Sequence, residues 1–137
     1  MMYQNQELHF ELNGKKFHCA LDVAMFFLGG KWKTVILWYL KNGTVRFSEL
    51  KRKIPKITEK MLSLQLRQME KDGFVARKIY PEVPPRVEYT LSQEGVKLLP
   101  IIEELARWGR YKAEKNARIV DSRTGKTVRI SFSKTRG

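Results

Sequence analysis

Two histidines and one cysteine have the widest chemical repertoire in this 137-residue chain, and they lie close together at His9, His18 and Cys19. An enzyme would need a nucleophile beside a base, a metal cluster or a glycine-rich loop that cradles phosphate. No further cysteine or paired carboxylate lies near these residues to complete a metal site. The sequence therefore predicts neither an enzyme nor a protein that holds a metal or other cofactor.

Positive charge is the stronger chemical signal in the sequence. The chain carries 27 lysines and arginines against 14 acidic residues, a formal net charge of +13. Such a field favours polyanions, either nucleic acid or an anionic membrane surface. The basic residues gather in residues 46–60, in residues 77–86 and from residue 107 to the end. The alternative is a solvated basic surface without a ligand.

Several classes of protein are excluded by the composition. No apolar run approaches the ~20 residues needed to span a bilayer, and residues 1–11 lack the pattern of a signal peptide. The single Cys19 cannot form an internal disulfide. We therefore expect a cytoplasmic protein with no membrane association and one folded domain flanked by short extensions.

The N-terminal region is predicted to form a β-hairpin followed by a helix. Polar and apolar residues alternate over residues 8–19 around Asn13-Gly14, a strong hairpin signal. A two-residue turn at Asn13-Gly14 would pair Phe10 with Phe17, His9 with His18 and Leu8 with Cys19 across the two strands. Asp22 is the expected N-cap of a short helix that ends at Gly29-Gly30.

Three helices are expected between residues 31 and 72. The first begins at Lys31 and places Trp32 in the core, and the second is capped by Ser48 and stopped by Pro55. Thr58 caps the third helix, which extends to Asp72 and has a buried stripe of Leu62, Leu66 and Met69.

A β-wing and a long helix are expected to follow. Residues 74–80 and 86–91 are predicted strands, joined by the proline-rich loop of residues 81–85. Ser92 begins the last helix, which Pro100 should kink, and its wide apolar arc indicates a partner chain. We divide the chain into an N-terminal arm (1–19), a central domain (20–113) and a basic C-terminal tail (114–137).

This order of elements predicts an α+β, mainly α, winged helix-turn-helix with an N-terminal β-hairpin and a long C-terminal dimerisation helix. The helix at residues 58–72 would then enter the major groove of duplex DNA. Leu64 could touch a thymine methyl group or be an ordinary exposed leucine. The candidate DNA-binding residues are Arg46, Lys56, Thr58, Lys60, Ser63, Leu64, Arg67, Lys71, Arg77, Lys78 and Arg86.

Five blocks in order resemble the HxlR family: Cys19, Gly29-Gly-Lys-Trp-Lys33, Phe47-Ser-Glu-Leu50, Met61-Leu62 with residues 66–73, and Val83-Pro-Pro-Arg-Val-Glu-Tyr89. The resemblance covers residues 18–112. It implies a homodimeric, sequence-specific transcription regulator related to the MarR-like proteins, with a dimer built from the first and last helices. The family usually has proline after the cysteine, whereas this chain has Ala20.

The resemblance also suggests that Cys19 senses oxidants or electrophiles, as the matching cysteine does in several members. Its position before a helix, near Lys15 and Lys16, favours a thiolate, whereas Asp22 has the wrong sign. The predicted hairpin puts Cys19 on the apolar face, which favours inert packing instead. Both interpretations stay open, and the sequence leaves the small-molecule effector unknown.

A winged helix that binds RNA or another protein is the alternative function, since a fold does not determine its ligand. RNA modules that read single strands expose aromatic side chains on a sheet. Most aromatic residues here occupy core-patterned positions, which favours duplex DNA as the partner.

Overall fold

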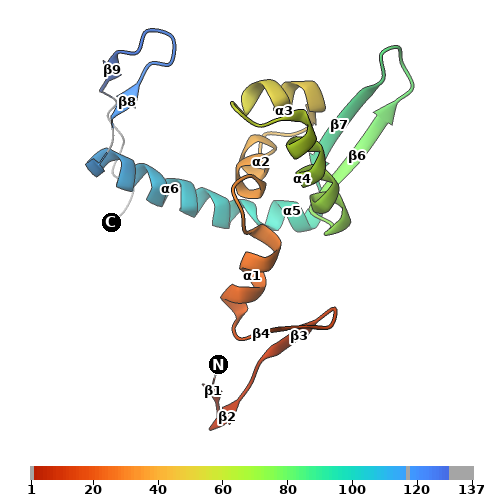
Figure 1. The fold of residues 1–137 in the computed structure, drawn as a ribbon, viewed down its shortest axis with the longest axis vertical. Coiled ribbons are helices and arrows are strands. Elements are labelled where there is room, and N and C mark those ends of the chain that lie inside the picture. The colour runs from red at the N-terminus through yellow and green to blue at the C-terminus, as the bar shows by residue number, and fades with distance from the viewer. Residues whose placement is uncertain (1, 117, 130–137) are drawn as a thin grey trace. The chain divides into compact units, whose positions relative to one another are not determined.

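The computed structural model describes residues 2–116 and 118–129. The chain divides into two compact units, Met1–Leu99 and Pro100–Gly137. In chain order the elements are β1 (Met2–Tyr3), β2 (Gln6–Glu7), β3 (Phe10–Leu12), β4 (Lys15–Phe17), α1 (Ala20–Leu28), α2 (Lys33–Tyr39), β5 (Val45–Arg46), α3 (Phe47–Lys53), α4 (Glu59–Lys71), β6 (Val75–Tyr80), β7 (Arg86–Leu91), α5 (Gln93–Lys97), α6 (Leu99–Asn116), β8 (Ile119–Val120) and β9 (Thr127–Val128) (Figure 1).

The predicted N-terminal hairpin is present as β3 and β4. Asn13 and Gly14 both take positive φ in its turn, and Phe10 pairs with Phe17. The ladder is shorter than predicted, so the expected His9–His18 and Leu8–Cys19 pairs lie beyond it. A preceding hairpin, β1–β2, was not predicted, because no Asn-Gly pair marks its Gln4-Asn5 turn.

Helix α1 begins earlier than its predicted cap. The N-cap is Cys19, which has extended backbone angles, and its carbonyl accepts a hydrogen bond from the Val23 amide at 3.3 Å. Asp22 lies inside the first turn, where its carboxylate accepts the His18 amide at 3.3 Å. The prediction of Asp22 as N-cap was therefore wrong, because this carboxylate bonds back towards the hairpin.

The core of the first unit lies where α2, α3 and α4 meet. Ile36 and Leu37 of α2, Leu50 of α3 and Leu66 of α4 are fully buried. Trp32 lies at the N-cap of α2 and is half-buried, so its part in the core is smaller than predicted.

Helix α3 also begins earlier than expected. Its N-cap is Arg46 and no side chain caps it, so the prediction that Ser48 caps this helix was wrong. The reason is the unpredicted strand β5, which pairs antiparallel with β7 through Val45–Tyr89 and Arg46–Glu88. The strand passes directly into the helix and leaves no room for the predicted cap.

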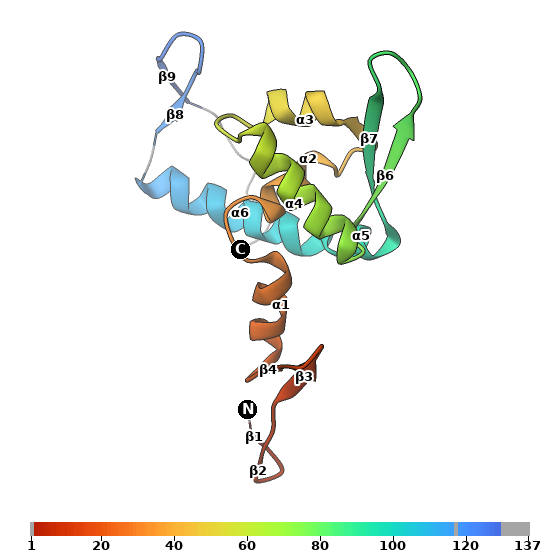
Figure 2. The same ribbon diagram turned by 45° about the vertical axis from the view of Figure 1, so that its right-hand side comes forward.

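The wing and the helix beside it form as predicted. Strands β6 and β7 pair from Val75–Leu91 to Tyr80–Arg86 and project beside α3 and α4 (Figures 1 and 2). Together with β5 they make a three-stranded sheet in the order β5-β7-β6. Gly73 ends α4 at φ +85°, the left-handed conformation expected of a helix C-terminus.

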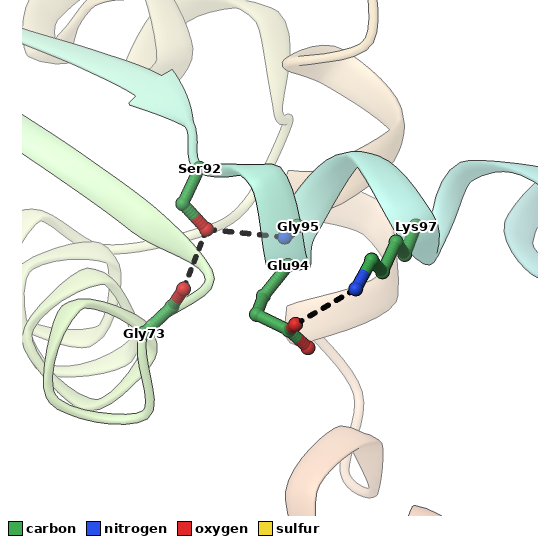
Figure 3. A network of polar contacts seen from close by, with 5 residues as sticks. All are labelled: Gly73, Ser92, Glu94, Gly95 and Lys97. Atoms are coloured by element: carbon green, nitrogen blue, oxygen red, sulfur yellow. Dashed lines mark hydrogen bonds and ion pairs between the residues drawn. The ribbon is translucent and has the colours of Figure 1, made fainter.

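Ser92 joins the wing to the following helix. Its hydroxyl accepts the Gly95 amide at 3.1 Å and donates to the Gly73 carbonyl, so one side chain connects α5 to the end of α4 (Figure 3). The predicted single helix is divided at Leu98 into α5 and α6, and Pro100 lies in the first turn of α6. Proline is tolerated there because that amide has no helical acceptor.

The second unit contains most of α6 and a short hairpin. Strands β8 and β9 pair around a turn in which the Asp121 carboxylate accepts the amides of Arg123 and Thr124. Both strands lie in the segment predicted as a basic C-terminal tail, of which residues 114–116 and 118–129 are described. No helix among the described residues is long and apolar enough to cross a membrane.

These elements and their order make an α+β winged helix-turn-helix with a long C-terminal helix, as the sequence predicts. Helices α3 and α4 form the helix-turn-helix pair, and β6 and β7 form the wing.

Candidate nucleic-acid interface

Helix α4 buries one apolar stripe and exposes charged side chains, together with Leu64, on its opposite side. Leu62, Leu66 and Met69 are fully buried against the core. On the opposite side, Lys60 and Arg67 are exposed, and neither forms an ion pair with any of the described residues. Two cations without carboxylate partners therefore face solvent from one side of a helix that packing holds rigidly.

A shallow hollow of about 520 Å³ lies on this outward side of α4. Its lining is Phe47, Glu59, Lys60, Ser63, Leu64 and Arg67. Leu64 is 40% exposed, so its methyl groups can be reached from outside. Four of the predicted site residues are thus brought together, and Phe47 and Glu59 join them without having been predicted.

Arg77 ties the wing to α4. Its Nε atom lies 3.4 Å from Oε1 of Glu70, so this ion pair joins β6 to the helix. Both side chains are more than a third exposed, and water weakens such a pair. The ion pair therefore serves to orient the guanidinium more than to stabilise the fold.

Arg86 is held more firmly than a freely exposed arginine. Its guanidinium lies 3.8 Å from the centroid of the Tyr80 ring, and its nitrogens approach Glu82 and Glu88 at 3.5 and 3.4 Å. Lys78 lies over the same ring at 4.9 Å. Because two carboxylates already face Arg86, we infer that it braces the wing more than it offers a free charge.

A cavity of about 600 Å³ lies between the wing and the helix-turn-helix pair. Its lining is Arg46, Phe47, Ser48, Ser63, Arg77, Glu82, Val83, Pro84, Pro85, Arg86, Val87 and Tyr89. Tyr89 is only 7% exposed, and burial raises the pKa of its phenol above the ordinary value, against the opposing effect of Arg77. The cavity brings Arg46, Ser63, Arg77 and Arg86 together from four separate elements.

Sequence reasoning missed Phe47 and Tyr89 as site residues. Tyr89 alternates with polar residues along β7 and has the pattern of an ordinary core position. Only the pairing of β5 with β7 brings it beside Arg46 and α4, and no local signal marks that pairing.

The remaining predicted site residues lie outside these two hollows. Lys56 occupies the turn between α3 and α4 at φ +69°, and Lys71 is the last residue of α4. Cys19 lies half-buried at the start of α1 and lines neither hollow. If Cys19 influences this interface, it must do so by changing the conformation of the elements that carry the interface, since it contributes no side chain to either hollow.

Thr58 serves α4 directly as its N-cap. Its hydroxyl oxygen accepts the Met61 amide at 3.0 Å, as predicted. We expect Thr58→Ala to lower the free energy of unfolding by about 1 kcal/mol, because the amide loses its acceptor. Chemical denaturation followed by circular dichroism measures this change. Thr58→Ser should restore most of the loss, and equal stability of the alanine variant would contradict the capping role.

The arrangement of cations suits binding to an extended anion. Cations stand on α4, at the end of β5 and on both wing strands, where they could contact successive phosphates. Among the described residues, no group of three histidine, cysteine or acidic side chains could hold a metal ion.

Comparison with known proteins identifies similar sequences. Residues 27–117 match the family model described as HxlR-like helix-turn-helix. The HTH-type transcriptional regulator YkvN of Bacillus subtilis (strain 168) is 52% identical over 101 residues, which cover 74% of this chain and 86% of YkvN.

Solved structures are similar in fold as well. A structure described as a transcriptional regulator of the MarR family, from Porphyromonas gingivalis W83, is 44% identical with a TM-score of 0.65, covering 67% of this chain and 90% of the other. The redox regulator HypR in its reduced form is 39% identical with a TM-score of 0.67, covering 71% of this chain and 96% of HypR. HypR has also been solved in its oxidised form.

Proposed function

The chain belongs to the HxlR-like helix-turn-helix family of transcription regulators, and from this membership we propose that it binds operator DNA as a homodimer. In this proposal α4 lies in the major groove and the wing contacts the flanking backbone. The observation that carries it is the outward side of α4, where Lys60 and Arg67 have no ion-pair partner among the described residues.

The contacts within this interface divide by chemistry. Arg67 and Lys60 reach guanine edges or phosphates, Ser63 can bond either, and Leu64 can meet a thymine methyl group. On the wing, Arg77 is oriented by Glu70 towards the DNA backbone. Arg46, Lys56, Lys71 and Lys78 add positive potential around this surface.

Fluorescence anisotropy with a labelled duplex tests the proposal. The duplex comes from the region upstream of the chain's own gene, and a shuffled duplex of equal length is the comparison. We expect tighter binding to the native duplex and an affinity that falls steeply with salt. Equal affinity for both duplexes and for an RNA hairpin would favour the alternative, a general nucleic-acid module. Binding to neither DNA nor RNA would favour a protein-interaction module.

Apolar side chains on the first and last helices support the dimer. Leu21, Met25 and Phe26 of α1 are all about half exposed or more, and no residue of α1 is fully buried. On α6, Leu105 is 54% and Trp108 is 61% exposed. Large exposed apolar groups on helices are typical of surfaces that meet another chain.

Leu105→Glu should dissociate the dimer, because it places a carboxylate within the proposed apolar interface. Sedimentation velocity is expected to show a dimer for the native chain and a monomer for Leu105→Glu. Lys97→Glu, an exposed change outside the proposed interface, is the control and should remain dimeric. A native chain that sediments as a monomer at all concentrations would contradict the dimer.

Regulation by oxidants through Cys19 is a hypothesis that the similarity to HypR supports. Cys19 is half-buried at the N-cap of α1, so a small oxidant can reach it. With one cysteine per chain, oxidation by diamide would join two Cys19 thiols from two subunits. As the S–S bond forms, the two thiols lose two electrons and two protons in total, and diamide takes up both to become the corresponding hydrazine. Inert packing remains the alternative.

Cys19→Ser separates these alternatives. If Cys19 is a sensor, diamide should weaken DNA binding by the native chain, dithiothreitol should restore it, and the serine variant should not respond. Anisotropy before and after each reagent measures the effect. DNA affinity of the native chain that is indifferent to diamide would assign Cys19 to packing.

A further inference from the structure

The hairpin of strands β8 and β9 lies outside the part of the chain that matches the family. The family model covers residues 27–117, and the two strands follow it as Ile119–Val120 and Thr127–Val128 (Figure 1). The helix-turn-helix pair and the wing are complete without the hairpin, since the wing ends at Leu91. The hairpin is therefore an addition to the common fold, with side chains of its own to offer a partner.

The turn of this hairpin is closed by its own hydrogen bonds. The Asp121 carboxylate accepts the amides of Arg123 and Thr124 at 2.8 and 3.3 Å. The Asp121 carbonyl accepts the Gly125 amide at 2.8 Å, and Gly125 takes the left-handed φ of +74° that this turn needs. The Asp121 amide donates to the Lys126 carbonyl at 2.9 Å. These bonds order the turn and fix the backbone that carries Arg123 and Lys126.

The hairpin contains four cations and one acidic residue. Arg118 and Arg129 lie directly outside the paired strands, whereas Arg123 and Lys126 lie in the turn, and all four are exposed. The carboxylate of Asp121 is engaged by the turn amides, and its ion pair with Arg123 at 3.7 Å is weak because Arg123 is 88% exposed. The other three cations form no ion pair with any of the described residues. Most of the positive charge is therefore available to a ligand.

The spacing of these cations fits a nucleic-acid backbone. A strand rises about 3.3 Å per residue, so the three positions from Arg118 to the turn at Asp121 separate the two groups of cations by about 10 Å. One strand of duplex DNA has a phosphate about every 3.4 Å along its axis. Both groups can therefore contact phosphates of one DNA strand together. Guanidinium groups suit this contact, because their donors match phosphate oxygens in pairs.

A membrane surface is a poorer partner for the hairpin. Val120 and Val128 are 42% and 38% exposed. Val128 pairs with Ile119 and not with Val120, so the two valines lie on opposite faces of the ribbon. Neither face has the broad apolar surface that an interfacial membrane element buries in lipid. A two-stranded antiparallel ribbon can enter the major groove of duplex DNA, so DNA fits both the charge and the shape of the hairpin.

We propose that the β8–β9 hairpin binds the phosphate backbone of duplex DNA without reading its sequence. This inference rests on the proposed function, which supplies duplex DNA as the ligand. The contacts of the hairpin add to those of α4 and the wing, so the hairpin raises the affinity for every duplex by a similar factor. Discrimination between the operator and other DNA remains with α4, since phosphate contacts carry no sequence information.

A variant that lacks three of these charges tests the proposal. Arg118→Gln, Arg123→Gln and Lys126→Gln are combined in the full chain, and Asp121 is left to close the turn. Fluorescence anisotropy with the native and the shuffled duplex is measured between about 50 and 200 mM salt. We expect the slope of the logarithm of the binding constant against the logarithm of salt concentration to become shallower by about two to three. At the lowest salt the affinity should fall about tenfold or more for both duplexes, with their ratio unchanged. An unchanged slope would overturn the proposal.

A second variant controls for the loss of net charge. Lys16→Gln, Lys31→Gln and Lys97→Gln remove the same number of charges from exposed positions outside the hairpin and outside the proposed DNA surface. This variant should keep the slope of the native chain to within about one. Equal changes of slope in the two variants would overturn the proposal, because net charge alone would then explain them.

Sedimentation velocity and binding to lipid vesicles test two other roles of the hairpin. We expect the hairpin variant to sediment as the native chain does. We also expect it to bind vesicles of phosphatidylglycerol and phosphatidylcholine as strongly as the control variant does. A change of the hairpin variant to a smaller assembly would assign these cations to the partner subunit. A selective loss of vesicle binding with an unchanged DNA slope would assign them to a membrane. Either result would overturn the proposal.

The inference and the proposed function can fail separately. If the native chain binds both duplexes equally but the hairpin variant has a shallower slope, operator recognition fails and the contact of the hairpin with DNA stands. If the native chain prefers its upstream duplex and the hairpin variant keeps the slope of the native chain, operator recognition stands and the inference fails.

Discussion

Arg67→Ala is expected to weaken operator binding by about 10- to 100-fold, the effect of losing one good contact in the major groove. Arg67 lies on the outward side of α4, one turn beyond Ser63, and has no carboxylate partner among the described residues. Its guanidinium is therefore free to bond a guanine edge or a phosphate. The fold should be unaffected, because the side chain is exposed.

The salt dependence of the Arg67→Ala variant distinguishes the two kinds of contact. Loss of a phosphate contact should weaken binding to every sequence. It should also reduce the slope of the logarithm of the binding constant against the logarithm of salt concentration by about one. Loss of a base contact should weaken the native duplex more than the shuffled one. Lys60→Ala is expected to follow the phosphate pattern, because lysine acts as a point charge.

Lys97→Ala is the control for both variants. Lys97 lies on α5, is paired with Glu94, and stands outside the proposed DNA surface. Melting curves and sedimentation should match the native chain for all three variants. Unchanged DNA affinity of both Arg67→Ala and Lys60→Ala would contradict the placement of α4 in the groove.

The outward side of α4 could be predicted because local rules determine it. Thr58 and Gly73 mark the two ends of the helix, and the spacing of Leu62, Leu66 and Met69 fixes its rotation about its axis. The wing could be predicted for the same reason, since alternation and a proline-rich loop are local signals.

The cavity could not be predicted, because it depends on pairing between distant segments. The two residues of β5 pair with residues of β7 that lie more than 40 positions later in the chain. This pairing places Arg46 next to Tyr89. A strand of two residues has no periodicity to detect. The same pairing moved the N-cap of α3 from the predicted Ser48 to Arg46.

The aromatic contacts around α1 could not be predicted from the sequence either. Phe17 meets Phe26 edge to face, with ring centroids 5.3 Å apart, and Phe27 meets Phe74 at 6.1 Å. These rings connect β4, α1 and the residue before β6. Apolar residues at such positions predict burial but not the partner that each one meets.

Gly95→Ala is expected to lower the free energy of unfolding by about 2 kcal/mol, the cost of forcing extra volume into a packed site. Helix propensity alone predicts the opposite, a gain of about 1 kcal/mol, because alanine is the better residue inside a helix. The two arguments differ in sign, so the experiment decides between a local rule and a tertiary contact.

The contact in question is between α5 and the carbonyl of Phe74. A Cβ atom on Gly95 would overlap the Phe74 carbonyl oxygen and lie 3.2 Å from Cδ2 of Leu91. The carbonyl cannot move aside easily, because it accepts the Ser92 amide at 3.0 Å. Ser92 is itself held by Gly73 and by the Gly95 amide (Figure 3). The added Cβ atom would therefore overlap a backbone carbonyl that is held in place, and no change of side-chain rotamer relieves that overlap.

Thermal denaturation followed by circular dichroism measures the outcome. A loss of about 2 kcal/mol corresponds to a fall in Tm of about 10 °C for a domain of this size. Gly109→Ala in α6 is the matched control, because no heavy atom of the described residues outside its own helix lies within 4 Å of the added Cβ. That variant should be equally stable or more stable than the native chain. A rise in Tm for both variants would show that α5 does not approach Phe74 as closely as the structure has it, and that helix propensity decides at both positions.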